Sequence, residues 1–323
     1  MTAGAILLTV IGVAIAAALA VALYFAFATW RIARRARALV PPPGSFVTIG
    51  GNRIHYVERG QGLPVLFVHG LGGTQFHFLP LFARLEKDFR LIAVDRPGSG
   101  YSTRRGLTPA SPKEQAEFIA SFIDTMKLDR PLLVGHSLGG AVSLATALDH
   151  RDRISGLALI SPLTHREGEV SPEFAPLLIR SPFKRRLIAN TVAVPISIKQ
   201  APATLGYVFG PQEPPTDYAI AGGAMSVLTP EHFFATSTDF GAVDKVMRAQ
   251  QDRYGELDLP VGVIFGTADR VLDWERHGKS LVGKIRDLDF ETIEGIGHMP
   301  QYVATGQVEA FIRRIAARAF AGR

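Results

Sequence analysis

The sequence contains no cysteine, and its first 30 residues contain no charged side chain. The first absence excludes disulfide bonds, thiolate metal sites and a cysteine nucleophile. Charged residues make up 20% of the 323 residues and hydrophobic residues 47%, a composition that provides a buried core and argues against disorder. The formal charge of +6 falls to +2 without the four arginines at positions 31, 34, 35 and 37. We therefore expect no nucleic-acid partner.

The uncharged amino terminus predicts a transmembrane helix over residues 1–30, with the lipid bilayer as a partner. Ala5–Thr29 is an almost continuous apolar run, longer than the about 20 residues that a helix needs to cross a bilayer core. Because the arginines follow it directly, the positive-inside rule predicts a single-pass protein whose C-terminal domain is cytoplasmic. The alternative is a signal peptide cleaved near Ala28, which would leave a periplasmic or secreted protein.

Residues 31–44 are predicted to form a basic, proline-rich linker, because the VPPPG stretch at 40–44 excludes a helix. After it, short apolar segments alternate with helical patterns. The predicted strands are Phe46–Ile49, Arg53–Glu58, Pro64–Val68, Leu91–Val94, Leu132–Val134, Ile154–Ile160, Pro260–Phe265 and Leu288–Ile293. Continuous apolar strands separated by helices favour a mostly parallel sheet covered by helices on both faces.

The stretch GHSLG at 135–139 matches G-x-S-x-G between an apolar strand and a run of helix formers. A nucleophilic serine in this context sits on a sharp strand-to-helix turn, which places Ser137 at the edge of the sheet. The flanking Gly135 and Gly139 leave space where a Cβ would collide. A chance match in a glycine-rich chain is the alternative, and the partners of Ser137 decide between the two.

A serine nucleophile needs an imidazole base, which in turn needs a carboxylate to orient it. Asp269 follows the strand ending at Phe265, and His298 follows the last predicted strand. Asp273 is the main rival for the acid. Asp95 instead fits a turn in which its carboxylate caps backbone amides. Of the other histidines, we expect His69 to shape the loop after its strand, His136 to point into the packing, and His77, His150 and His277 to fill ordinary helix or loop positions.

With these residues in the order serine, aspartate, histidine, the chain resembles a serine α/β-hydrolase of the esterase and lipase type. The motifs that carry the resemblance are HGLGG (69–73), DRPGSGYS (95–102), GHSLGG (135–140), GTADRVLD (266–273) and GIGHMPQ (295–301). The resemblance implies the α/β-hydrolase fold, with a core of residues 45–162 and 241–323 and an inserted helical cap of residues 163–240. It also implies an oxyanion hole formed by the backbone amides of Leu71 and Leu138.

The resemblance implies a serine hydrolase that cleaves carboxylic esters through an acyl-enzyme on Ser137, with no cofactor or metal required. Its N-terminal helix makes it similar to membrane-anchored monoacylglycerol lipases, so the expected substrate is a small lipid-like ester. The same triad also serves carbon–carbon bond hydrolases of ring-fission products and cofactor-free haloperoxidases or perhydrolases. A non-catalytic binding protein on this fold is a further alternative, although the intact triad argues against it. The resemblance implies no particular oligomeric state.

Overall fold

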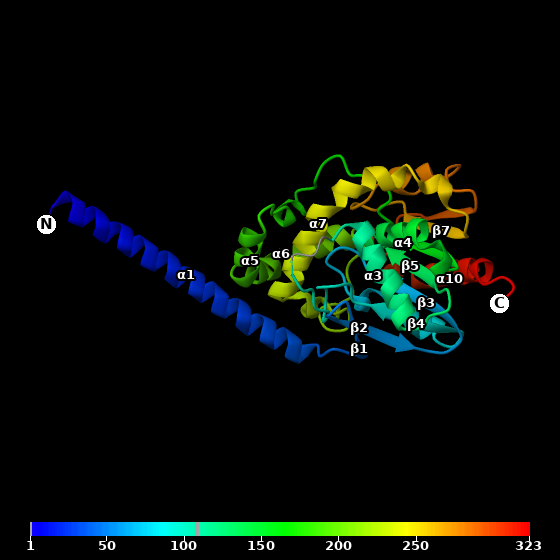
Figure 1. Ribbon diagram of the computed structural model, residues 1–323, viewed down its shortest axis with the longest axis horizontal. Helices are drawn as coiled ribbons and strands as arrows, with labels where there is room; N and C mark the ends of the chain where they lie inside the picture. Colours follow the sequence, from blue (N-terminus) through cyan, green and yellow to red (C-terminus); the bar gives the residue numbers. More distant parts are fainter. Residues whose placement is uncertain (1, 107–109) are drawn as a thin grey trace.

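A twisted sheet of eight strands forms the centre of the computed structural model, which describes residues 2–106 and 110–323 (Figure 1). The strand order is β1-β2-β4-β3-β5-β6-β7-β8. Only β2 pairs antiparallel, with β1 on one side and β4 on the other, and the remaining neighbours are parallel. This confirms the mostly parallel sheet predicted from the sequence. The strands are β1 (Ser45–Ile49), β2 (Asn52–Arg59), β3 (Leu63–Val68), β4 (Phe89–Val94), β5 (Leu132–His136), β6 (Gly156–Ile160), β7 (Val261–Gly266) and β8 (Leu288–Ile293).

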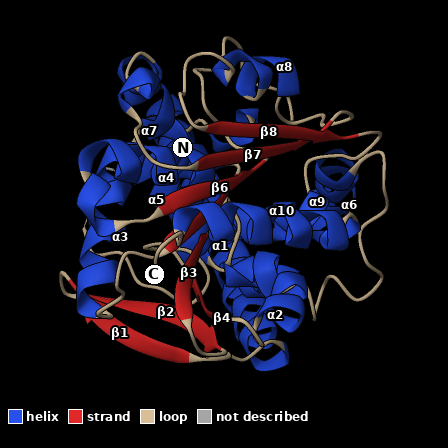
Figure 2. Ribbon diagram, turned by 90° about the vertical axis from the view of Figure 1, so that its right-hand side faces the viewer, coloured by secondary structure: helices blue, strands red, loops and turns tan. Residues whose placement is uncertain are grey.

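Two hydrophobic clusters cover the two faces of this sheet (Figure 2). Along β3, Leu66 and Val68 face the cluster formed with α3 (Pro112–Thr125) and α4 (Leu138–Asp149), whereas Phe67 faces the cluster formed with α2 and α10. Alternating residues of a strand point to opposite faces, so a fully apolar strand is required where both faces are covered. The remaining helices of the core are α2 (Leu79–Leu85), α8 (Trp274–His277), α9 (Pro300–Val303) and α10 (Thr305–Ala319).

The segment after β6 is helical and contributes no strand to the sheet. It contains α5 (Pro182–Asn190), α6 (Ala193–Phe209) and α7 (Pro230–Gln251). Helix α7 continues past residue 240, the boundary expected for the cap, and its C-terminal half buries Met247 in the core. Pro230 stands at the first position of the helix, where proline is tolerated. Gly241 lies at the expected boundary, but one glycine in a helix costs only about 1 kcal/mol relative to alanine, so the helix continues past it.

The N-terminal helix α1 (Ala3–Leu39) extends away from the sheet (Figure 1) and contacts α5 and α6 near its C-terminal end. The predicted linker over 31–44 is therefore wrong in its first part, because residues 31–39 continue the helix. Their sequence, RIARRARAL, consists of residues with high helix propensity apart from Ile32, and the first barrier to a helix is the proline after Val40. Ala33, Ala36 and Val40 are buried, so this end of α1 packs against the folded domain.

Candidate active site

Ser137 occupies a strained turn between β5 and α4. Its backbone has φ 53° and ψ −122°, a region that residues with a side chain rarely adopt. The turn is held from both sides: the Ser137 amide donates to the carbonyl of Ile160 (3.1 Å), and the Ser137 carbonyl accepts from the amides of Gly140 (2.8 Å) and Leu163 (3.0 Å). Strain of this kind persists where the surrounding structure fixes it, and it is concentrated at functional sites.

The glycines around Ser137 are required by close approaches of the backbone. A Cβ on Gly139 would lie 2.0 Å from the carbonyl oxygen of Val68, and one on Gly135 would lie 2.7 Å from the carbonyl oxygen of Gly139. A Cβ on Gly70, in the loop after β3, would lie 2.9 Å from the Cβ of Ser137. These distances agree with the reason given for the glycines of the G-x-S-x-G stretch, and they place the 69–73 loop directly beside the serine.

Asp269 and His298 form a buried pair at the same end of the sheet. The Oδ2 of Asp269 lies 2.7 Å from Nδ1 of His298, and Asp269 Oδ1 accepts from the amides of Val271 (2.8 Å) and Leu272 (3.0 Å). The two side chains are 0% and 4% exposed. Because Nδ1 of His298 donates to the carboxylate, Nε2 is left as the nitrogen able to accept a proton.

The rival carboxylates are engaged elsewhere. Asp273 is the N-cap of α8, with Oδ1 accepting from the amides of Glu275 (2.8 Å) and Arg276 (3.0 Å). Asp95 accepts from the amides of Gln75 (2.8 Å) and Tyr101 (3.1 Å), the amide-capping role expected for it. Neither carboxylate binds His298, so the geometry favours Asp269 as the acid.

Ser137 follows His136, whose ring contacts the ring of His298 at a tilt of 50°. The rings of His136 and His298 have centroids 4.9 Å apart. In the described part of the chain, neither Ser137 Oγ nor His298 Nε2 has a hydrogen-bond partner. The structure therefore brings the three residues to one edge of the sheet and joins two of them directly. In ligand-free enzymes the hydrogen bond between nucleophile and base is often long and tightens when substrate binds.

His136 has a contact that the sequence did not indicate. The side chain is buried, as expected, and its Nε2 donates to the backbone carbonyl of His298 (2.9 Å), so it also supports the loop that carries the proposed base. Burial lowers the pKa of His136 well below 6.5, which keeps the ring neutral with its proton on Nε2. No sequence pattern predicts this contact between the ring of His136 and the carbonyl of His298, because the two residues are 162 positions apart.

Arg96 holds the loop beside Ser137. This buried guanidinium donates from Nε to the carbonyl of His69 (3.0 Å) and from one terminal nitrogen to the carbonyl of Gly70 (2.8 Å). In a trans peptide the C=O and the following N–H point in opposite directions, so the amide of Leu71 is turned away from Arg96. His69 also donates from Nδ1 to the Gly70 carbonyl (2.8 Å), in agreement with its expected role in this loop.

Helix α7 is tied to the same loop by two side chains. His232 donates from Nε2 to the carbonyl of Gly72 (3.1 Å) and accepts on Nδ1 from the amide of Gly100 (3.0 Å). Asp239 accepts from Arg96 (2.8 Å) and from Arg104 (2.7 Å), and its side chain is 1% exposed. Burial lowers the pKa of His232 to about 4, so the ring is neutral near pH 7.

Leu138 begins α4, and its amide is among the first-turn donors that have no partner within a helix. It therefore lies where the second oxyanion donor was expected from the sequence. Within residues 2–106 and 110–323, no group of three or more histidine, aspartate or glutamate side chains is arranged to hold a metal ion. The chemistry available at this site is that of a serine, an imidazole paired with a carboxylate, and nearby backbone amides.

Comparison with known proteins agrees with this arrangement. Residues 65–311 match the family described as the alpha/beta hydrolase family. The chain belongs to that family. The α/β-hydrolase fold expected from the sequence is therefore confirmed.

Individual relatives are distant or match over part of their length. A protein of Xenopus laevis named monoacylglycerol lipase abhd6-A is 26% identical over 262 residues, which cover 78% of this chain and 76% of the relative. Haloalkane dehalogenase 2 of Mycobacterium tuberculosis is 37% identical over 107 residues, 33% of this chain. The matched residues span 37% of the length of that dehalogenase, so the chain covers about a third of the length of several curated relatives.

Solved structures show the same fold at low identity. A structure described as a membrane phospholipase A has a TM-score of 0.66 and 21% identity, covering 97% of this chain and 99% of that one. An esterase from Thermogutta terrifontis has a TM-score of 0.64 and 23% identity, covering 85% and 99%. Coverage of 97% includes most of α1, so the likeness to the first structure extends to the N-terminal helix.

Proposed function

We propose that this protein is a membrane-anchored serine esterase that cleaves lipid-like carboxylic esters, such as monoacylglycerols. The observation that carries the proposal is the 2.7 Å contact between Asp269 Oδ2 and His298 Nδ1, at the sheet edge where Ser137 occupies its strained turn. The contact fixes the tautomer of His298, and a strained turn of this kind is the context in which a serine nucleophile is found. Both features are what a serine acyl-transfer site needs.

The reaction follows from these positions. Ser137 Oγ attacks the ester carbonyl carbon while His298 Nε2 takes the hydroxyl proton, and Asp269 stabilises the resulting imidazolium. The amides of Leu71 and Leu138 bind the negative oxygen of the tetrahedral intermediate; losing one such donor commonly costs about 3 kcal/mol of transition-state stabilisation. The bond to the alcohol oxygen then breaks, and His298 returns the proton to that oxygen. Water then attacks the acyl carbon while His298 takes its proton. The bond to Ser137 Oγ breaks, His298 returns the proton to Oγ, and the carboxylic acid leaves.

The lipid-like substrate is supported by α1. It is the helix, within the described residues, that is long and apolar enough to cross a membrane, and none of its most apolar 18 residues is buried in the protein. As a bilayer span it would keep the catalytic domain at the membrane surface, where amphiphilic esters are concentrated. We propose a single-pass topology with the catalytic domain in the cytoplasm, because the arginines follow the apolar run. The helical segment 163–240 serves as the cap over the site in this proposal.

Two measurements test the proposal. A fluorophosphonate probe should label the full chain in detergent, and Ser137→Ala should lose the label. The same preparation should hydrolyse monoacylglycerols faster than short water-soluble esters. Absence of labelling in the folded parent chain would refute the serine mechanism. Preference for short soluble esters with no activity on monoacylglycerols would refute the lipid-like substrate and leave the mechanism standing.

A further inference from the structure

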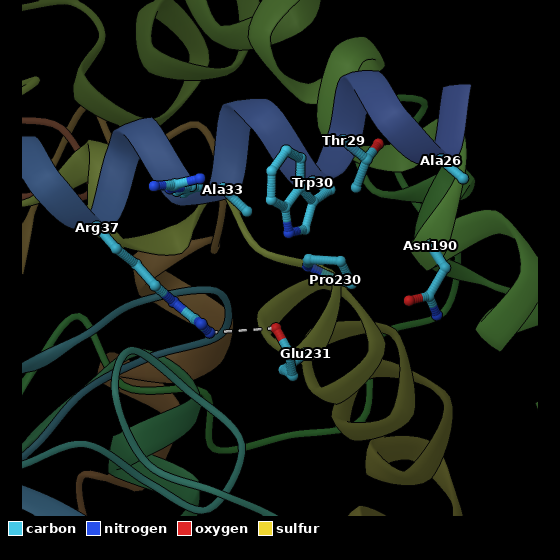
Figure 3. Close-up of a pocket in the computed structure, with 9 residues that line it drawn as sticks. Ala26, Thr29, Trp30, Ala33, Arg37, Asn190, Pro230 and Glu231 are labelled. Atoms are coloured by element: carbon cyan, nitrogen blue, oxygen red, sulfur yellow. Dashed lines mark hydrogen bonds and ion pairs between the residues drawn. The ribbon is translucent and has the colours of Figure 1, made fainter. Parts of the chain in front are cut away.

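Two cavities adjoin one another between α1 and the helical segment that follows β6. The smaller, of about 380 Å³, is shown in Figure 3, and the larger has a volume of about 850 Å³. Both are lined by Arg37, Asn190, Pro230 and Glu231, so they form one groove that passes the ion pair between Arg37 and Glu231. The proposed triad contributes no residue to the lining of either cavity, which makes the groove separate from the active site.

The groove changes in character along its length. The apolar side chains of the smaller cavity are Ala26, Trp30 and Ala33 of α1, with Pro230 opposite Trp30 (Figure 3). Its remaining lining residues are Thr29, Arg34, Arg37, Asn190 and Glu231. The larger cavity is lined by four arginines and one glutamate: Arg37, Arg53, Arg104, Arg186 and Glu231. One end therefore suits hydrocarbon or a glycerol backbone, and the other suits an anion.

The arginines of the larger cavity are unequally neutralised. Arg104 is paired with the buried Asp239 at 2.7 Å. Arg37 contacts Glu231 at 3.3 Å, but both side chains are more than half exposed, and such pairs contribute about 1 kcal/mol or less. Arg53 and Arg186 lie over the rings of Phe46 and Phe234 and have no carboxylate within ion-pair distance among the described residues.

Two unpaired guanidinium groups beside one cavity match the oxygens of a phosphate group. Arginine binds phosphate through two parallel N–H···O bonds, and these charge-assisted bonds are about twice as strong as neutral ones. Glu231 in the same wall would repel any anion, but its charge is partly neutralised by Arg37.

The position of the groove along α1 agrees with the depth of lipid phosphates. Arg37 follows Trp30 by seven positions, which is about 10 Å along a helix. The headgroup layer on each side of a bilayer core is roughly 5–7 Å thick. If the apolar run spans the bilayer up to Trp30, as the proposed function requires, the backbone at Arg37 lies a few ångströms beyond that layer, and lipid phosphates are within reach of its long side chain.

We propose that this groove binds one anionic phospholipid. Its phosphate is held by Arg53, Arg186 and Arg37, and its glycerol and the first carbons of its chains lie along Ala26 and Trp30. The lipid would join α1 to the segment after β6 and fix the domain against the membrane. It is bound and not hydrolysed, since Ser137 is not part of the groove.

The experiment uses the full chain in nanodiscs of equal phosphatidylglycerol and phosphatidylcholine, released into native mass spectrometry. We expect one phosphatidylglycerol to be retained in preference to phosphatidylcholine. The double variant Arg53→Gln/Arg186→Gln should lower its retention about tenfold. The matched control Arg248→Gln/Arg286→Gln, which removes two exposed arginines outside the groove, should retain it as the parent does.

A second variant separates a fitted lipid from general attraction to cationic surface. Ala26→Trp fills the apolar end without changing the charge, and it should also reduce retention of phosphatidylglycerol. Equal loss in the control pair, or full retention by Ala26→Trp, would overturn the proposal. So would displacement of the lipid by inorganic phosphate, which would indicate an anion site without a lipid. Circular dichroism checks that each variant folds, so the result does not depend on esterase activity.

Discussion

At the scale of single residues, the carboxylate of Asp269 has a fixed orientation. One oxygen accepts two backbone amides, and the other lies 2.7 Å from His298 Nδ1. The carboxylate can therefore hold the imidazole in a single tautomer. The strained turn does the equivalent for Ser137, whose backbone is fixed from both sides. Substitutions here change the reaction by altering which atom carries a proton.

We expect Asp269→Asn to lower kcat for ester hydrolysis by about 10³–10⁴-fold, because an amide can hold the imidazole in the wrong tautomer and cannot stabilise its cation. The measurement is steady-state hydrolysis of a soluble ester by the full chain in detergent. Asp273→Asn is the matched control: it makes the same change four positions away, at the N-cap of α8, and should leave kcat within a few fold. Equal effects of the two substitutions would remove Asp269 from the proposed relay.

At the scale of elements, helix α7 connects the segment after β6 to the loop beside Ser137. Asp239 shares its carboxylate between Arg96 and Arg104, and Arg96 in turn binds the carbonyls of His69 and Gly70. The position of Leu71, one of the two proposed oxyanion donors, therefore depends on a helix that begins more than 90 residues after Ser137 in the sequence. We infer that α7 acts as a fixed support for this loop.

We expect Asp239→Asn to reduce the free energy of unfolding by about 3–5 kcal/mol, since it leaves two largely buried guanidinium groups without a carboxylate. Urea unfolding followed by circular dichroism gives the value. Asp244→Asn on the same helix removes an exposed pair with Arg166, at 3.5 Å, and should cost about 1 kcal/mol or less. A loss at Asp239 no greater than at Asp244 would show that α7 does not hold Arg96 in place.

His232 predicts a pH dependence of stability. Burial lowers its pKa from 6.5 to about 4, so between these pH values the unfolded chain binds a proton that the folded chain does not. The free energy of unfolding that depends on neutral His232 is fully present above pH 6.5. It is lost as the pH falls toward 4, by up to about 1.4 kcal/mol per pH unit. We expect the parent to lose more stability than His232→Gln between pH 7 and pH 5. Urea unfolding at both pH values measures this difference, and equal losses would contradict the assignment.

The sequence predicted these elements unevenly, for physical reasons. The strands and the motifs that follow them were predictable, because each has a local signal in the sequence. These signals are apolar runs, glycine-rich turns and the residues Ser137, Asp269 and His298 at strand ends. The contacts of His136 and His232 were not, since they depend on which backbone carbonyl lies opposite each ring after folding. The predicted linker was wrong over 31–39 because the VPPPG stretch at 40–44 excludes a helix only from its own start, and arginine is a good helix former.

At the scale of the whole molecule, α1 decides where the catalytic domain lies. The helix has 37 residues, or about 55 Å, and its apolar part leads directly into the end that packs on α5 and α6. A helix of this length crosses the bilayer core of about 30 Å and continues beyond it. In the proposed topology, this helix would hold the folded domain next to the membrane.

The absence of cysteine allows the orientation to be measured directly. We expect a cysteine in the variant Thr2→Cys to react with a membrane-impermeant maleimide on intact cells. One in Lys113→Cys, on an exposed position of α3, should react only after lysis. These outcomes follow from the arginines that flank the apolar run on its C-terminal side. The reverse labelling, or release of Lys113→Cys protein into the medium, would contradict a cytoplasmic catalytic domain.

In the proposed mechanism, Ser137 carries the acyl group during turnover. The most direct measurement is peptide mass spectrometry of the full chain, quenched with acid within the first turnovers of an activated ester. We predict an acyl adduct on the peptide that contains Ser137, absent from Ser137→Ala, which should also lose hydrolysis. An adduct on another residue, or ester turnover that persists in folded Ser137→Ala protein, would contradict the account.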